Sequence, residues 1–345
     1  MELVRRAGYD DDHATFRDSV RRFVADHVGV ELDRWRTEGR FDVALLADAG
    51  EQGFLGTTVA EEHGGAGVDD PRFPAVLVEE LARSGATGLA LVVARQLGVV
   101  IPVVAAHAKQ TEDAARWLSG LAAGELVACV GVLKPDATAS AVPGAAVADL
   151  FVLADAERVV VVTGDVVTIE ATPLLGGADA AVANVTVDPA VLAVAPTLDS
   201  VDQLYGALDL WTSVVSLGAA RAALDLTVDY VQERAVFGRP LSSFENTRFR
   251  LAEAGAELAA AQGLLDGALD ALASDGLTPE LAAAVRIVSE RVHDAVVDQG
   301  MQLHGGYGYM REYPISHAFG DARFVRVTAS GASEPRTAVA AALGL

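Results

Sequence analysis

A pair of glycines at the end of an apolar, helix-like run is the feature of this sequence that most directly suggests chemistry. Gln302 lies at the end of the run, and Gly305 and Gly306 follow three and four residues later. Glycine lets the backbone approach another molecule closely, and successive backbone N–H groups can bind an anion. A simple turn is the other interpretation of a Gly-Gly pair, and the pair alone does not decide between the two.

Other familiar site patterns are missing from the sequence. No Gly-x-Gly-x-x-Gly follows a strand-like run, so there is no dinucleotide-binding fingerprint of the Rossmann type. No His and Cys residues have the spacing of a zinc site, and no nucleophile motif of the Gly-x-Ser-x-Gly type occurs. A bound dinucleotide would therefore have to be held in another way.

The composition favours a globular protein that binds neither nucleic acid nor membranes. A chain of 345 residues with 51% hydrophobic content can bury large cores, which we expect in more than one domain. The formal net charge of −22 argues against nucleic acid and anionic membrane surfaces, because both attract basic patches. The apolar stretch 88–106 contains Arg95, Gln96 and Pro102, so we expect buried helices there rather than a membrane span.

Two features predict a cytoplasmic location. The single cysteine, Cys129, cannot form an intramolecular disulfide, which fits a reducing compartment. Residues 1–6 are followed by acidic residues rather than by the apolar run of a signal peptide.

Hydrophobic periodicity divides the chain into three parts. Helical spacing of apolar residues predicts an N-terminal α-helical domain over residues 1–124. Short β-rich runs predict a small middle β domain over residues 125–197. Long Ala- and Leu-rich segments at 204–232, 244–274 and 279–304 predict a C-terminal four-helix bundle over 198–345, with Thr278 as a helix cap. The predicted fold class is mainly α with a small, β-barrel-like domain in the middle.

Three motifs resemble those of the acyl-CoA dehydrogenase family, in the same order and over nearly the whole chain. The C-terminal motif runs over residues 302–314 and is followed by Asp321-Ala322-Arg323. The middle motif is Glu-Arg-Ala-Val-Phe-Gly-Arg-Pro-Leu-Ser-Ser-Phe at 233–244, and the N-terminal motif combines glycine-rich segments at 53–56 and 61–67. The resemblance implies the family's fold with a shortened middle domain, FAD as cofactor, an acyl-CoA substrate and an electron-transfer flavoprotein as acceptor.

The ADP-binding half of the implied FAD site matches the family well. In the family, the bundle of a neighbouring subunit holds the ADP portion of FAD, and the resemblance places Arg234 on its pyrophosphate. A guanidinium suits that role because its fork makes two parallel hydrogen bonds to phosphate oxygens. Without the motif, a surface salt bridge to Glu233 or Asp229 would explain Arg234. Glu245 departs from the Gln that the family commonly has. The resemblance places these further residues at the ADP portion: Phe237, Glu245, Gln302, Gly305, Gly306, Ser333 and Glu334.

The half that would hold the flavin ring and the thioester departs from the family. Leu133 and Lys134 replace a Thr-Glu pair, and leucine offers no hydrogen-bonding group to a flavin ring. Ser330 stands where the family often has the carboxylate base, and a hydroxyl cannot replace that base. Other members take the base from the first bundle helix, at the position of Leu208. The neighbouring Asp209 is turned by about 100° from that position, so we expect it on the polar face of the helix.

Two smaller departures lie near the C-terminal motif. Gly320 precedes Asp321, where the family usually keeps an arginine. His304 replaces an apolar residue before the glycine pair, and a hydrogen bond from its ring to the helix end explains it as well as a catalytic role does.

The leading hypothesis is a subunit without a base of its own. It would contribute the ADP-binding half of a FAD site to a catalytic partner subunit in an α2β2 heterotetramer. This arrangement resembles that of the short, degenerate subunits of actinobacterial acyl-CoA dehydrogenases that act on steroid side chains. One alternative is a self-sufficient homo-oligomer that uses Asp209 or another carboxylate as base. Another is a non-catalytic scaffold, for which we expect no bound flavin even with the partner present.

Overall fold

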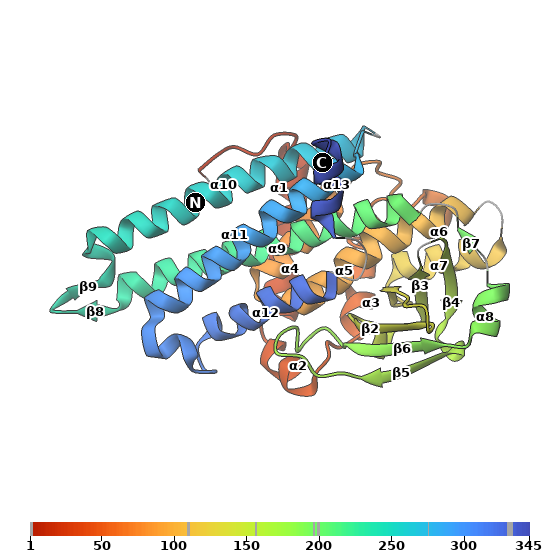
Figure 1. The fold of residues 1–345 in the computed structure, drawn as a ribbon, viewed down its shortest axis with the longest axis horizontal. Helices are drawn as coiled ribbons and strands as arrows, with labels where there is room; N and C mark the ends of the chain where they lie inside the picture. The colour runs from red at the N-terminus through yellow and green to blue at the C-terminus, as the bar shows by residue number, and fades with distance from the viewer. Residues whose placement is uncertain are drawn as a thin grey trace.

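The computed structural model describes residues 3–108, 111–155, 157–195, 197–198, 201–274, 276–329 and 334–345. Helices come first, strands follow, and long helices complete the chain (Figure 1). This order confirms the predicted fold class.

The N-terminal part consists of helices, with a long connection between the third and the fourth that contains the 3-10 turn Glu61–His63. They are α1 (Asp11–His27), α2 (Leu32–Glu38), α3 (Ala44–Glu51), α4 (Arg72–Arg83), α5 (Thr87–Arg95), α6 (Ile101–Ala108) and α7 (Glu112–Ala123). The side chain of Asp10 accepts hydrogen bonds from the N–H groups of Asp12 and His13, which starts α1. Thr111 caps α7 in the same way, through the N–H of Ala114.

The apolar stretch in this part is a buried helical rod. A π-helical turn, Gln96–Val100, joins α5 to α6, so the apolar stretch 88–106 consists of three helical segments. Among the described residues, Thr87–Ala106 is the one stretch that is long and apolar enough to cross a membrane, and 78% of its most apolar window is buried inside the protein. A stretch buried to this extent is typical of a core helix.

The strands of the middle part form two sheets. The first has the order β1-β3-β4-β7, from β1 (Ala128–Val132), β3 (Leu150–Ala154), β4 (Val159–Thr163) and β7 (Thr197–Leu198). The second has the order β2-β6-β5, from β2 (Thr138–Val142), β6 (Ala183–Val187) and β5 (Val167–Ala171), and α8 (Pro189–Val194) follows β6. β1 and β3 are parallel, and the other pairs in these two sheets are antiparallel. A separate apolar core around Phe151 and Leu153 contains residues from both sheets.

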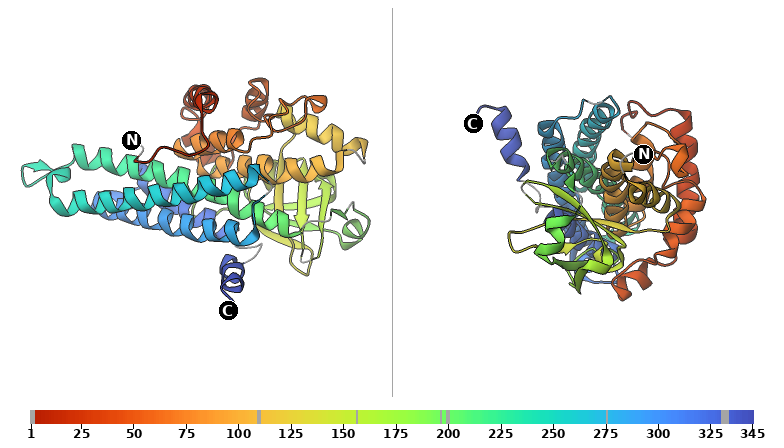
Figure 2. Two further views of the ribbon diagram at one scale, coloured as in Figure 1. Left: turned by 90° about the horizontal axis from the view of Figure 1, so that it is seen from above. Right: turned by 90° about the vertical axis from the view of Figure 1, so that its right-hand side faces the viewer.

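Long helices form the C-terminal bundle. They are α9 (Val201–Glu233), α10 (Glu245–Ala273), α11 (Pro279–His304) and α12 (Pro314–Ala329), and a short α13 (Pro335–Ala342) follows and projects from the body (Figure 2). The hydroxyl of Thr278 accepts a hydrogen bond from the N–H of Leu281, so this residue caps α11 as predicted. A hairpin of β8 (Ala235–Val236) and β9 (Arg239–Pro240) joins α9 to α10 at one end of the bundle. α9 packs along α11 and against α4, so the bundle and the N-terminal helices share one core.

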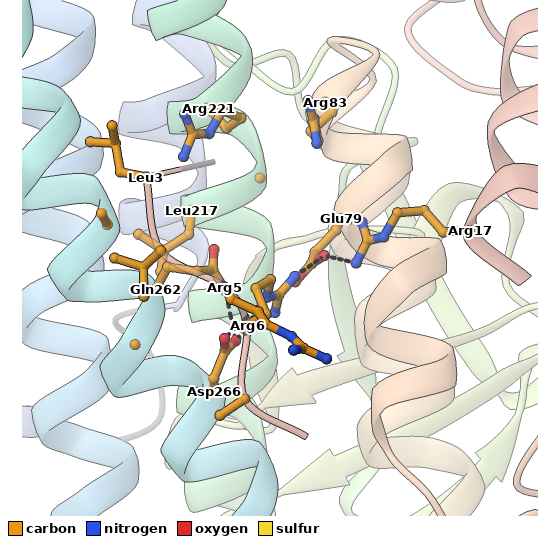
Figure 3. Close-up of a pocket in the computed structure, with 15 residues that line it drawn as sticks. Leu3, Arg5, Arg6, Arg17, Glu79, Arg83, Leu217, Arg221, Gln262 and Asp266 are labelled. Carbon is orange, nitrogen blue, oxygen red and sulfur yellow. Dashed lines mark hydrogen bonds and ion pairs between the residues drawn. The ribbon is translucent and has the colours of Figure 1, made fainter. Parts of the chain in front are cut away.

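The segment before α1 is attached to the bundle by one arginine (Figure 3). Arg6 donates hydrogen bonds to Glu79 of α4 at 2.6 Å and to Asp266 of α10 at 2.5 Å. Arg17 of α1 donates to the same Glu79 at 2.8 Å. Glu79 and Asp266 are buried, so these charge-assisted hydrogen bonds link the N-terminal helices to the bundle with little competition from water.

Two buried carboxylates lie where the β domain touches α5 and α12. Asp179 accepts a hydrogen bond from the N–H of Leu89 at 2.8 Å, and Asp321 accepts one from the N–H of Gly177 at 2.7 Å. Burial and the nearby Asp179 raise the pKa of Asp321 to about 7, and burial also raises the pKa of Asp179. The folded state is therefore more stable with Asp321 protonated than with Asp321 ionised.

The raised pKa of Asp321 predicts that the protein loses stability as the pH rises. Because the folded-state pKa of Asp321 lies above that of an unfolded chain, the folded state binds more protons between about pH 4 and 7. We expect the free energy of unfolding to fall through that window, by up to about 4 kcal/mol from this group. Asp321→Asn keeps an acceptor for the N–H of Gly177 and should flatten the dependence in urea titrations at several pH values. Asp26→Asn, at an exposed position of α1, is the control. An unchanged pH slope in Asp321→Asn would contradict this interpretation.

Candidate functional site

A cavity of about 830 Å³ lies at the end of the bundle that carries the β8–β9 hairpin. Residues of α9, the connection from α9 to α10, α10, α11 and the turn after α11 line it, among them Arg234 of the connection and Arg250 of α10. None of the described residues that line it is acidic, although the chain has 48 acidic residues against 26 lysines and arginines. This cavity therefore favours an anion, in a protein whose overall charge repels one.

Backbone hydrogen bonds and an aromatic ring hold Arg234 at the start of the β8–β9 hairpin. Its N–H donates to the carbonyl of Tyr230 at 2.8 Å, and its carbonyl accepts from the N–H of Leu241 at 2.7 Å. Its guanidinium carbon lies 5.2 Å from the centre of the Tyr307 ring. No ion pair of Arg234 with Glu233 or Asp229 is found among the described residues, so the surface salt bridge does not explain this side chain.

The histidine before the glycine pair is structural. The Nδ1 of His304 lies 2.8 Å from the carbonyl oxygen of Gly300, which confirms the predicted hydrogen bond to the helix end. Its ring stacks on Tyr230 with centres 3.9 Å apart. Burial lowers the pKa of His304, so the ring is mainly neutral at pH 7. The cationic character of the cavity thus comes from the arginines.

The glycine pair leaves open space beside the cavity. Gly305 has φ 60° and ψ −135°, a conformation that suits glycine alone, and a Cβ built on it or on Gly306 would meet no atom within 4 Å. Gly306 is therefore required neither by backbone conformation nor by packing inside the chain. Both glycines line the cavity, so the space they leave is available to a ligand.

The structure brings some of the remaining predicted residues to this end of the bundle. Gln302, in the last turn of α11, lines the cavity, and Phe237 lies in the hairpin with φ 51° and is 98% exposed. An aromatic residue in this strained conformation and fully in solvent is well placed to contact another molecule. Glu245 is the exposed first residue of α10, next to the cavity but not in its lining.

The last two predicted cofactor residues lie elsewhere. Ser333 lies outside the described residues. Glu334 caps α13, which lies away from the β8–β9 hairpin in both Figure 1 and Figure 2. One chain therefore does not bring Glu334 together with Arg234, and the two could serve one nucleotide only as parts of different subunits.

Sequence reasoning missed Arg250 and Gln299, which lie on facing walls of the cavity. Arg250 of α10 donates to the side-chain oxygen of Gln299 of α11 at 3.4 Å. Helical spacing would have indicated them, because Asn246 and Arg250 share a face of α10, as Gln299 and Leu303 share a face of α11. Only the packing of α10 on α11 shows that these faces meet.

The candidate base Asp209 is buried, so the expectation of a polar-face position is wrong. It is 5% exposed, and its Oδ1 accepts a hydrogen bond from Arg286 of α11 at 3.2 Å. Every residue of α9 from 208 to 220 is buried, so the helix has no exposed polar face at this level. Burial raises the pKa of Asp209 to about 6, against the lowering effect of Arg286. Arg286 also binds Glu290 at 2.7 Å, so Asp209 belongs to a buried ion network.

The residues that replace the family's flavin-ring contacts have structural roles. Leu133 packs against the core between the two sheets, and its N–H donates to the carbonyl of Ala154 at 2.7 Å. The ammonium of Lys134 donates to the hydroxyl of Ser140 at 2.6 Å at the surface. Ser330 lies outside the described residues. Among the described residues, no group of three or more His, Cys, Asp or Glu side chains could hold a metal ion.

Two family models match the chain on either side of the β domain. Residues 10–125 match the N-terminal domain of acyl-CoA dehydrogenases, and residues 210–343 match the C-terminal domain. The fold, the order of the domains and these matches define a flavin-dependent class of oxidoreductases. The chain belongs to the acyl-CoA dehydrogenase family.

Relatives and solved structures agree with this assignment. The chain is 25% identical to the mitochondrial long-chain specific acyl-CoA dehydrogenase of Rattus norvegicus, over 93% of this chain and 83% of the relative. It is 28% identical to a probable acyl-CoA dehydrogenase of Bacillus subtilis, over 92% and 94% of the two chains. The acyl-CoA dehydrogenase of Geobacillus kaustophilus has a similar fold, with a TM-score of 0.87, 22% identity and coverage of 99% and 100%. A glutaryl-CoA dehydrogenase of Mycobacterium smegmatis in complex with FADH2 superposes with a TM-score of 0.85, 21% identity and coverage of 97% and 95%.

FAD is the cofactor of this family, and the described residues fit one half of it. The arginines and open glycines of the bundle cavity suit a diphosphate. Leu133 and Lys134 do not suit the polar edge of a flavin ring, because one is packed in a core and the other is turned to Ser140.

Gly306→Val tests whether the open space by the glycine pair serves a cofactor. We expect thermal stability to change by less than about 0.5 kcal/mol, since the added side chain meets nothing inside the chain. FAD retention by the assembled enzyme should fall at least tenfold, because the valine fills the approach to the cavity. Gly263→Val, on α10 with equally open space, is the control. Equal FAD retention in both variants would show that Gly306 belongs to a simple turn.

Proposed function

We propose that this chain contributes the ADP-binding half of a FAD site to a catalytic acyl-CoA dehydrogenase subunit, within an α2β2 heterotetramer. The observation that carries the proposal is the contrast between two places in the bundle. The cavity with Arg234 and Arg250 contains no described acidic residue, whereas the buried carboxylate of Asp209 is engaged by Arg286. This contrast supports a chain that binds a nucleotide and leaves removal of the proton to its partner.

The roles of the residues follow from their positions. Arg234 and Arg250 would bind the pyrophosphate, Gln302 and the glycine pair would let it approach the backbone, and Phe237 would pack beside the cofactor. In α,β-dehydrogenation a carboxylate removes the α-proton of the thioester, and FAD, when bound, accepts the β-hydrogen as hydride. We assign that carboxylate and the flavin-ring pocket to the partner subunit.

The proposal extends to substrate and acceptor. The resemblance to degenerate subunits of steroid side-chain dehydrogenases supports a bulky acyl-CoA as substrate and a cytoplasmic α2β2 enzyme. An electron-transfer flavoprotein would be the acceptor.

The chain purified alone tests this function. We expect it to contain little FAD and to cause no bleaching of added FAD with an acyl-CoA, since the flavin-ring half and the base belong to the partner. Flavin that copurifies with the chain alone and is bleached by an acyl-CoA would contradict the proposal.

A self-sufficient enzyme with Asp209 as base is the second candidate. The observation that favours it is the pKa of Asp209, raised to about 6 by burial, which lies near that of an efficient general base. Asp209→Asn separates the two functions: the activity of the complex should survive this substitution if the partner supplies the base, and should disappear if Asp209 is the base.

A further inference from the structure

A second cavity, of about 740 Å³, lies between the N-terminal helices and the bundle. The start of α4, the π-helical turn, α6, the start of α9 and the turn between α10 and α11 surround it. None of the residues named above for the FAD site lines it. Its volume falls in the range of small-molecule sites, about 300–1,000 Å³.

The inner wall of this cavity is apolar. Leu97, Ile101 and Trp211 are each at most 3% exposed and form a packed base beneath it, whereas Ala207, Leu272 and Leu277 are partly exposed and offer apolar surface to a ligand. A Cβ on Gly98 would lie 2.1 Å from the indole of Trp211, so the ring packs directly on the π-helical turn. π-Helical turns within helices are frequent at functional sites. Ala105 of α6 and Ala207 of α9 lie in the wall as well, and their small side chains keep the cavity open.

The polar groups of the cavity select against anions. No Lys, Arg or His is among the described residues that line it, whereas Asp69 and Asp70 lie at its edge. Asp70 is paired with Arg72 at 2.8 Å, and Asp69 is exposed. Asp69 can therefore accept a hydrogen bond from a ligand, as can the hydroxyl of Thr278. A fatty-acid carboxylate or a CoA phosphate would be repelled, and a hydroxyl group would be bound.

This cavity and the buried ion network lie on opposite sides of α9. Ala207 and Trp211 are one turn apart and face the cavity, while Asp209 is rotated by roughly 160–200° from both and faces Arg286. A molecule in the cavity would therefore not meet the position proposed for an alternative base.

We propose that this cavity binds a neutral, mainly hydrocarbon molecule that carries a hydroxyl group, independently of the FAD site. The hydrocarbon part lies against Ala207, Leu272 and Leu277, and the hydroxyl lies at the edge, within reach of Asp69. The apolar lining accommodates the alkyl or ring part, and the carboxylates at the edge set the charge that is accepted.

The full chain without FAD or partner tests this site with neutral N-phenyl-1-naphthylamine as a fluorescent probe. We expect the probe to bind, dodecan-1-ol to displace it, and dodecanoate at pH 8 to compete at least tenfold less well. Asp69→Asn should reduce this preference for the alcohol at least threefold, because it removes a charge from the edge. Equal competition by the alcohol and the acid, or no probe binding, would overturn the proposal.

Cavity-filling variants exclude binding elsewhere on the surface. Ala207→Phe should weaken probe binding at least tenfold, and Ala256→Phe, at an exposed position of α10, should leave it unchanged. Ala105→Phe, at an exposed position of α6, gives a second test if Ala207→Phe unfolds, as judged by circular dichroism. Undiminished probe binding in the folded variants would show that the probe binds outside the cavity. Because no FAD or partner is present, this result does not depend on the proposed function.

Discussion

Arg234→Ala is expected to remove most of the FAD from the complex of this chain with its catalytic partner. A charge-assisted hydrogen bond contributes about 1.5–3 kcal/mol, so one lost guanidinium should weaken FAD binding by roughly 10- to 150-fold. Arg234→Ala/Arg250→Ala should weaken it further, because no cation would remain among the described residues that line the cavity. The measurement is the flavin content of the gel-filtered complex, followed by titration of the apo-complex with FAD.

The matched control for this prediction lies on the same helix as Arg250. Arg248 is exposed on α10 and does not line the cavity. Arg248→Ala changes the net charge by the same amount and should leave FAD binding within about twofold. If both variants lose FAD to the same degree, the effect comes from overall charge, and the cavity is not the nucleotide site.

Arg286→Met is expected to cause the largest loss of stability of any single substitution considered. Removing one partner of a buried ion pair costs roughly 3–5 kcal/mol, because the remaining charge is left without a partner. In this variant Asp209 and Glu290 would lose the guanidinium that pairs with both of them. Urea unfolding of the purified chain at pH 8, compared with Arg291→Met at an exposed position of α11, measures the loss.

The same variant should depend on pH in a defined direction. The pKa of Asp209 is already raised to about 6, and loss of Arg286 should raise it further. A raised folded-state pKa of a carboxyl group gives stability at low pH that disappears as the pH rises. The deficit of Arg286→Met should therefore be smaller at pH 5 than at pH 8, and adding Asp209→Leu should recover part of it. If Arg286→Met loses the same free energy of unfolding at both pH values, the loss comes from packing and not from the unpaired charge.

The sequence predicts the helical parts of the fold closely, because their signals are local. The third bundle helix spans Pro279–His304 as predicted, since Thr278 and Pro279 start it and Gly305 ends it. The strand β2 was not predicted, because its Thr-Ala-Ser-Ala-Val sequence has little strand propensity. Its place in a sheet depends on pairing with β6, which lies more than forty residues away in the sequence.

Part of the candidate site was predictable from the sequence, because some of its residues lie close together along the chain. Gln302, Gly305 and Gly306 lie within one short motif, so their proximity is local. Arg250 joins them only because α10 packs on α11, and sequence alone does not show that contact. The burial of Asp209 likewise depends on which helices surround α9. The position of Asp209 on the helix, one residue from Leu208, does not show that.

The stoichiometry of FAD tests the central claim most directly. This chain is co-expressed with a longer acyl-CoA dehydrogenase subunit, and FAD is measured per complex by absorbance after release, with chain amounts from amino-acid analysis. A site shared between the two chains predicts one flavin for each pair of chains. One flavin for each chain would show that this polypeptide holds a complete FAD site, and would contradict the account.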